Sequence, residues 1–132
     1  MILLDTDVIS ATRRTPRVAE WVAQQNSSRV FLSVLTIGEI AKGARMLAAK
    51  DAAASRYLTI WAEQVRNEFA ERVIGIDEAI ALEWGRVAAI RTRGVADGLI
   101  AATAIVHGLT VATRNIADFA DTGASVVDPW EG

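Results

Sequence analysis

The sequence contains no cysteine and only one histidine. Without cysteine the chain can form neither a disulfide framework nor a thiolate metal site, and its composition fits a reducing compartment such as the cytoplasm. No apolar run reaches the length of about 18 residues that a membrane-spanning helix needs. No basic segment precedes the apolar start of the chain at Ile2, so we expect no signal peptide.

The size and composition of the chain are those of an ordinary globular protein. With 132 residues, of which 52% are hydrophobic and 23% charged, the chain suits one core, and we predict a single domain over residues 1–132. The formal net charge of −2 lacks the basic excess that is typical of nucleic-acid binders. Divalent cations held by acidic side chains would neutralise or reverse this charge, so net charge does not decide the partner.

Short apolar segments alternate with helical patterns along the whole chain. This order predicts an α/β fold with a central, mostly parallel sheet of four or five strands flanked by helices. The strands are expected at residues 1–5, 29–33, 72–76, 109–113 and 125–127. In such sheets the segments that follow the strands share one edge, which is where ligands bind.

Four acids fall at the ends of these strands or near the starts of helices: Asp5, Glu39, Asp97 and Asp118. Taken singly, Asp5, Asp97 and Asp118 could cap a turn or helix, and Glu39 could pair with Lys42. Taken together, they are expected at the same edge of the sheet, where they would repel one another unless cations neutralise them. An all-oxygen donor set favours a hard cation such as Mg²⁺ or Mn²⁺.

Four stretches resemble the motifs of PIN domains: LLDTDVIS, SVLTIGEIAKG, ADGLIAATAIVHGLTVATRNIADF and the closing DPW. Within that family the chain resembles the VapC toxin ribonucleases of bacterial toxin–antitoxin pairs, in particular the FitB-like branch. The resemblance covers essentially the whole chain, and it is most specific in residues 97–119.

The resemblance implies a three-layer PIN-like fold and an endoribonuclease that hydrolyses RNA phosphodiester bonds with Mg²⁺ or Mn²⁺. The metal-binding acids of the family match Asp5, Glu39, Asp97 and Asp118. Polar residues that support them match Thr6, Asp7, Thr113 and Asn115. Asp7 departs from the family, which usually carries asparagine there. Arg114 is expected either to contact a substrate phosphate or to be an ordinary surface arginine.

The resemblance also implies a homodimer in the cytoplasm and a cognate VapB-like antitoxin. After the predicted helix cap Asp51, a large apolar side chain recurs every four residues: Tyr57, Trp61, Val65 and Phe69. This stripe is interpreted either as packing on the core or as a partner surface. In the second case we expect it to form the antitoxin groove together with the helix of Glu39.

Two other functions are compatible with parts of the sequence. Asp5 to Val8 also resembles the opening motif of haloacid-dehalogenase-type phosphatases, in which the first acid is a nucleophile. That chemistry needs a lysine near a later strand, whereas Lys42 and Lys50 lie within or just after the third helix. A catalytically silent PIN-like binding module is the other alternative. Loss of acids would favour it, yet all four positions are occupied.

Overall fold

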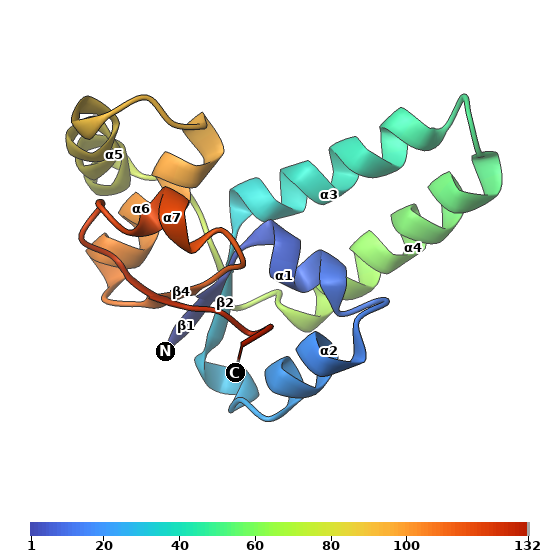
Figure 1. The fold of residues 1–132 in the computed structure, drawn as a ribbon. Helices are drawn as coiled ribbons and strands as arrows, with labels where there is room; N and C mark the ends of the chain where they lie inside the picture. The colour runs from blue at the N-terminus through green and yellow to red at the C-terminus, as the bar shows by residue number, and fades with distance from the viewer. Residues whose placement is uncertain (132) are drawn as a thin grey trace.

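The computed structural model describes residues 1–131, which form three layers around a central sheet (Figure 1). Within these residues five strands form one sheet in which every pairing is parallel. The strands are β1 (Ile2–Leu4), β2 (Val30–Ser33), β3 (Val73–Ile74), β4 (Thr110–Ala112) and β5 (Ser125–Val127). Their order, β3-β2-β1-β4-β5, places β1 in the centre. The predicted α/β fold with a parallel sheet is confirmed.

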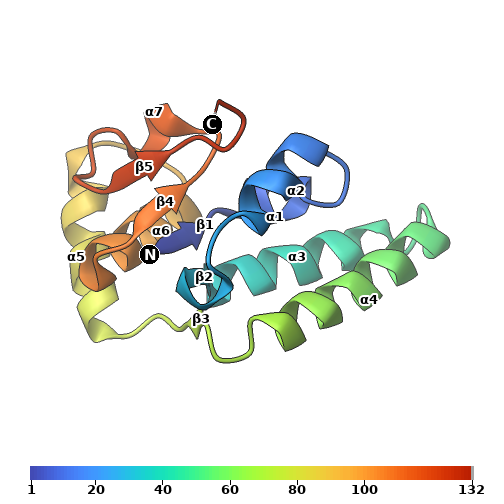
Figure 2. The same cartoon turned by 90° about the horizontal axis from the view of Figure 1, so that it is seen from below.

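Helices cover both faces of the sheet (Figure 2). One face carries α1 (Thr6–Ala11), α2 (Pro16–Ala23), α3 (Val34–Leu47) and α4 (Ala52–Glu68). The opposite face carries α5 (Glu78–Ile90), α6 (Val95–His107) and α7 (Ile116–Phe119). A short 3₁₀ turn, η1 (Ser27–Arg29), precedes β2. Across residues 1–131, no helix is both long enough and apolar enough to cross a membrane.

The side chains of each strand point alternately to the two faces of the sheet, and the core is therefore divided into two clusters. In β1, Leu3 packs with α5, α6 and α7, while Leu4 packs with the helices of the other face. In β4, Val111 and Ala112 divide in the same way. Because successive strand side chains point to opposite faces, both faces of this sheet are apolar, as expected for a parallel sheet covered by helices.

Several helix boundaries differ from the sequence prediction. The sequence predicts helix caps at Asp51, at Asp77 and, before Pro16, at Thr15. Asp51 and Asp77 cap α4 and α5 through their side chains, but Thr15 precedes α2 without forming a side-chain cap. The helical pattern after Asp77 also predicts a helix that continues to about residue 93 and is ended by Gly94. It stops at Ile90, and Gly94 instead precedes α6. The connection between these two helices therefore carries residues 91–94.

Helices α3 and α4 form a hairpin that extends beyond the sheet (Figure 1). Near the sheet, Val65 and Phe69 are buried in the core, whereas Tyr57 is 56% exposed toward the far end. The core-packing interpretation of the apolar stripe therefore holds for Val65 and Phe69, and a partner surface at Tyr57 stays a prediction. The helical pattern predicts Ala41 on the same apolar face of α3 as Ile40 and Ala44, but Ala41 is exposed. It lines an open groove of about 460 Å³ between the two helices.

Candidate active site

Asp5 lies at the carboxyl edge of the sheet, directly after the central strand β1. Its backbone N–H donates to the carbonyl oxygen of Ala112 on β4 (2.9 Å). The backbone N–H of Thr6 donates to its Oδ1, and the hydroxyl of Thr113 donates to its Oδ2, both at 2.9 Å. The carboxylate of Asp5 is therefore fixed at both oxygens, and the residue is only 5% exposed.

Burial raises the pKa of Asp5 from 3.8 to about 7, and the negative charge of Asp7 adds to this increase. The hydrogen bonds from Thr113 and Thr6 oppose the shift, and the charge of Asp97 contributes a further increase. A carboxylate that has lost its water and faces other carboxylates is stabilised by a positive charge. Asp5 therefore has the electrostatic surroundings of a cation ligand.

Asp7 connects α1 to the segment after β4. Its Oδ2 accepts the backbone N–H of Arg114 (3.1 Å), while its Oδ1 is buried and has no hydrogen-bond partner among residues 1–131. Burial raises the pKa of Asp7, with further increases from the charges of Asp97 and Asp128. Asparagine at this position would carry no charge, so Asp7 adds an acid to this edge of the sheet.

Asp97 lies in the first turn of α6, as the sequence predicted for a helix that begins at this edge. Burial raises its pKa, and the charges of Asp118 and Glu39 raise it further, whereas the charge of Arg93 lowers it. Helix α6 packs closely on α5 because Gly98 has no side chain: a Cβ there would lie 3.1 Å from the ring of Trp84.

Glu39 is turned toward α1 by the hydroxyl of Thr6, which donates to its Oε1 (2.7 Å). The same hydroxyl lies 3.0 Å from that of the buried Thr36. Among residues 1–131 Glu39 forms no ion pair with Lys42. The alternative interpretation of Glu39 as half of a surface pair is therefore not observed.

Asp118 lies in α7, which follows β4 after a short connection. In that connection the backbone N–H of Asn115 donates to the hydroxyl of Thr113 (3.0 Å). The side chain of Asn115 does not cap α7. The guanidinium of Arg114 lies 5.0 Å from the centre of the Trp130 ring.

All the residues selected from the sequence thus lie on the segments that follow strands or begin helices at one edge. The acids are close enough for the charges of Asp7 and Asp97 to raise the pKa of Asp5, and for the charges of Asp118 and Glu39 to raise the pKa of Asp97. Within residues 1–131, however, no three Asp, Glu or His side chains are gathered tightly enough to form a ready metal-binding group. The acids are spread along this edge of the sheet instead of meeting at one point.

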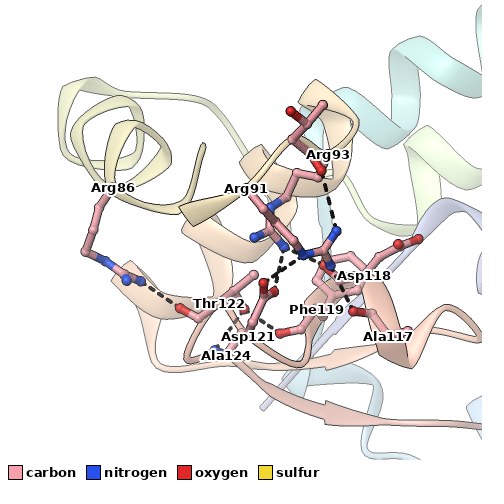
Figure 3. Close-up of polar contacts among 10 residues, drawn as sticks. Arg86, Arg91, Arg93, Ala117, Asp118, Phe119, Asp121, Thr122 and Ala124 are labelled. Carbon is pink, nitrogen blue, oxygen red and sulfur yellow. Dashed lines mark hydrogen bonds and ion pairs between the residues drawn. The ribbon is translucent and has the colours of Figure 1, made fainter. Parts of the chain in front are cut away.

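The sequence reasoning missed two arginines beside this site, Arg91 and Arg93. They reach from the connection between α5 and α6 to the segment of Asp118 and Asp121 (Figure 3). The sequence does show these two arginines just before Asp97, but the residues that they contact in that segment lie more than twenty positions later in the chain. The positions of the half-buried Asp128 near Asp7 and of the half-buried Trp130 beneath Arg114 were likewise not foreseen.

The donor set fits a hard divalent cation. The available ligands are carboxylate oxygens and hydroxyls, which suit Mg²⁺ and Mn²⁺. The buried Oδ1 of Asp7, which has no hydrogen-bond partner within residues 1–131, could donate an electron pair to a cation at the same edge. Burial and, to a smaller extent, repulsion between the acids raise the pKa values of Asp5, Asp7 and Asp97, and a bound cation would relieve both effects.

The sequence matches the PIN domain family over residues 2–124, and the chain belongs to that family. It is 34% identical to a VapC ribonuclease of Sinorhizobium fredii, with 99% of each chain covered. It is 36% identical to the toxin FitB of Neisseria gonorrhoeae, over 98% of this chain and 99% of that one. The crystal structure of FitAcB from Neisseria gonorrhoeae superposes with a TM-score of 0.91 at 35% identity, covering all of both chains. The resemblance stated from the sequence is thereby confirmed.

Proposed function

We propose that this single-domain protein is an endoribonuclease, the toxin of a toxin–antitoxin pair, that hydrolyses RNA phosphodiester bonds with Mg²⁺ or Mn²⁺. The observation that carries the proposal is the buried Asp5 at the carboxyl edge of the sheet, near enough to Asp97 for the charge of Asp97 to raise its pKa. It occurs in a chain that is similar over nearly its full length to a VapC ribonuclease and to the toxin FitB.

We assign different roles to the four acids according to their surroundings. Asp5 and Asp97 would hold the principal cation, and Glu39 and Asp118 would hold a second ion or orient the attacking water. A cation bound there would lower the pKa of that water and offset charge on the leaving oxygen. Thr113 keeps the Asp5 carboxylate in one orientation, and Thr6 does the same for Glu39.

Arg114 is the proposed contact for a substrate phosphate. Its backbone is fixed by Asp7, and its exposed guanidinium lies over the ring of Trp130. Stacking of this kind orients the planar guanidinium while leaving its N–H groups free to bind an anion. A guanidinium held in this way can bind the phosphate of an RNA strand that lies along the acidic edge.

For the partners we propose a homodimer and a VapB-like antitoxin, both acting in the cytoplasm. The groove between α3 and α4 has an apolar floor of Ile37, Ala41, Ala44 and Ala62 and a charged rim of Arg45, Glu63 and Arg66. An amphipathic helix from an antitoxin would match this distribution of apolar and charged groups. Tyr57 and Ile60, both 56% exposed, extend the apolar surface along α4.

The alternatives are separated by one experiment. Membership of the PIN family removes the phosphatase reading, so the remaining question is whether the chain is active or a silent binding module. We expect Asp97→Asn to abolish divalent-dependent RNA cleavage while leaving the circular dichroism spectrum unchanged. Glu78→Gln is the matched control, since Glu78 occupies the first turn of α5 as Asp97 does in α6. Equal cleavage by Asp97→Asn and the parent would refute the proposed activity.

A further inference from the structure

Two arginines in the connection between α5 and α6 form hydrogen bonds with the chain that follows β4. Arg93 Nη1 donates to the carbonyl oxygen of Asp118 (2.7 Å) and to Oδ1 of Asp121 (2.9 Å). Arg91 Nε donates to Oδ2 of Asp121 (2.7 Å), and its Nη2 donates to the carbonyl oxygen of Ala117 (3.0 Å). We name Arg91, Arg93 and Asp121 the arginine clamp (Figure 3).

Within the arginine clamp only Arg93 is deeply buried. Its side chain is 3% exposed, against 41% for Arg91 and 37% for Asp121. The Nε and Nη2 groups of Arg93 are buried and have no hydrogen-bond partner among residues 1–131. Burying a guanidinium with unpaired donors costs folding free energy, and replacing buried ion pairs with apolar side chains of similar size is often neutral or stabilising in proteins. Stability alone therefore does not account for an arginine here.

The position of Arg93 offers another account. It lies one turn before Asp97, and its Cδ is 3.8 Å from the place of a Cβ on Gly98. Its charge acts on the carboxylate of Asp97, while its Nη1 holds the backbone of Asp118. A single side chain thus joins the segments of the two acids that lie on the α6–α7 side of the site. In Figure 3 the Asp118 and Asp121 side chains extend in different directions, so Arg93 holds Asp118 without occupying its carboxylate.

We propose that Arg93 is a positioning residue of this site. By fixing α7 against the start of α6 it sets the separation of the Asp97 and Asp118 carboxylates, and its charge offsets part of their repulsion. Arg91 acts with it by orienting Asp121, which accepts one guanidinium at each oxygen. This inference rests on the proposed function, because it concerns how that site presents two of its cation ligands.

A purely structural role would be the same for any arginine that ties down this segment, and the chain provides one for comparison. Arg86 Nη2 donates to the carbonyl oxygen of Thr122 (2.7 Å), and its Nε pairs with Glu83 (2.6 Å). It holds the chain just beyond Asp121, and among residues 1–131 its hydrogen bonds go to Glu83 and Thr122 and not to α7 (Figure 3). Arg86→Gln is therefore the matched control for Arg93→Gln.

The test measures cation binding in the absence of RNA. Isothermal titration calorimetry with Mn²⁺ is performed on the full chain, its Arg93→Gln and Arg93→Lys variants, and Arg86→Gln. Loss of a residue that orients metal ligands weakens affinity by about 10- to 100-fold, and we expect this for Arg93→Gln. Arg86→Gln should bind Mn²⁺ like the parent. Arg93→Lys, which keeps the charge and a donor for the Asp118 carbonyl, should recover part of the affinity.

A kinetic measurement separates positioning from substrate binding. We expect Arg93→Gln to lower kcat for RNA cleavage at saturating Mn²⁺ while KM for RNA stays unchanged. If Arg93→Gln does not fold, Asp121→Asn replaces it, because Asp121 is at the surface and its substitution weakens one contact of each arginine while their bonds to the backbone of α7 remain. A smaller loss of Mn²⁺ affinity is then expected.

The outcomes distinguish the two levels of the proposal. Suppose that the parent binds Mn²⁺ and that Asp97→Asn is inactive. If Arg93→Gln, or Asp121→Asn in its place, then binds Mn²⁺ as tightly as Arg86→Gln does, the positioning role alone is overturned. If the parent binds no Mn²⁺ and Asp97→Asn cuts RNA normally, the proposed function fails and the positioning role fails with it.

Discussion

The two sides of the acidic edge hold their carboxylates in different ways. On the β1 side, Asp5 is buried and both of its carboxylate oxygens accept hydrogen bonds from groups on strand ends. On the α6–α7 side, Asp97 and Asp118 are half-buried, and Asp118 is held through its backbone carbonyl by Arg93. The first arrangement fixes a side chain directly, whereas the second fixes the segment that carries it.

This difference suggests what each side does when a cation binds. A carboxylate fixed at both oxygens keeps one orientation, so the β1 side provides a rigid reference point. Side chains fixed only through their backbone can still rotate, so Asp97 and Asp118 can adjust to the ion. The contrast can be tested by changing one group on each side and comparing the effects.

The largest effect is expected from Asp5→Asn. In the folded, cation-free protein the pKa of Asp5 is about 7, whereas in the unfolded chain its pKa is 3.8. The folded state therefore binds more protons between these values, and stability falls as pH rises through them. Between pH 5 and 8 this amounts to about 3 kcal/mol. We expect urea unfolding of Asp5→Asn to show a much weaker pH dependence and greater stability than the parent at pH 8.

The same measurements include their own control. Adding Mn²⁺ at pH 8 should stabilise the parent, because a ligand that binds only the folded state shifts unfolding by mass action. Asp5→Asn should gain little from Mn²⁺ and should not cleave RNA. An unchanged pH dependence in Asp5→Asn would show that the buried carboxylate of Asp5 is not the origin of the effect.

A smaller loss is expected from Thr113→Val on the rigid side. The hydroxyl of Thr113, which is fully buried, donates to Asp5 and accepts from the backbone of Asn115. Its removal leaves both partners unsatisfied, at a cost of about 2 kcal/mol in the free energy of unfolding. RNA cleavage should fall with it, whereas Thr113→Ser should retain both properties. Parent-like activity in Thr113→Val would contradict the idea that Asp5 must be fixed.

The smallest effect is expected from the corresponding substitution Thr6→Val. The hydroxyl of Thr6 donates to Glu39, which is exposed to solvent and can bind water instead, so only the buried hydroxyl of Thr36 loses a partner that water does not replace. We therefore expect a loss of stability of about 1 kcal/mol and only a modest reduction of kcat, both measured beside Thr6→Ser. If Thr6→Val were as damaging as Thr113→Val, Glu39 would belong to the rigid side of the site.

The sequence was sufficient to predict the sheet and the edge at which the acids lie. Asp5 and Asp118 follow strands, and Asp97 begins a helix that runs back along the sheet, so strand order alone places them together. All five strands were predicted within a few residues because apolar runs bounded by polar residues mark them clearly. Which carboxylates ligate a cation remains a prediction.

What the sequence did not reveal depends on distant contacts. The helical pattern of α5 continues past Ile90, but Arg91 and Arg93 are drawn to Asp121, a residue that no local pattern connects to them. Ala41 shares the apolar face of α3 with Ile40 and Ala44, yet it lines the open groove between α3 and α4 instead of packing against the core. Burial depends on what lies opposite a side chain, which periodicity cannot specify.

The pairing of Asp5 with Thr113 spans 108 residues, nearly the whole chain. During synthesis β1 therefore emerges from the ribosome long before its neighbour β4 and the Thr113 hydroxyl. Asp97 and Asp118 are also made long after Asp5. A growing polypeptide therefore carries Asp5 without the hydroxyl that holds its Oδ2, and the acidic edge is completed only after the segment through Asp118 has been synthesised.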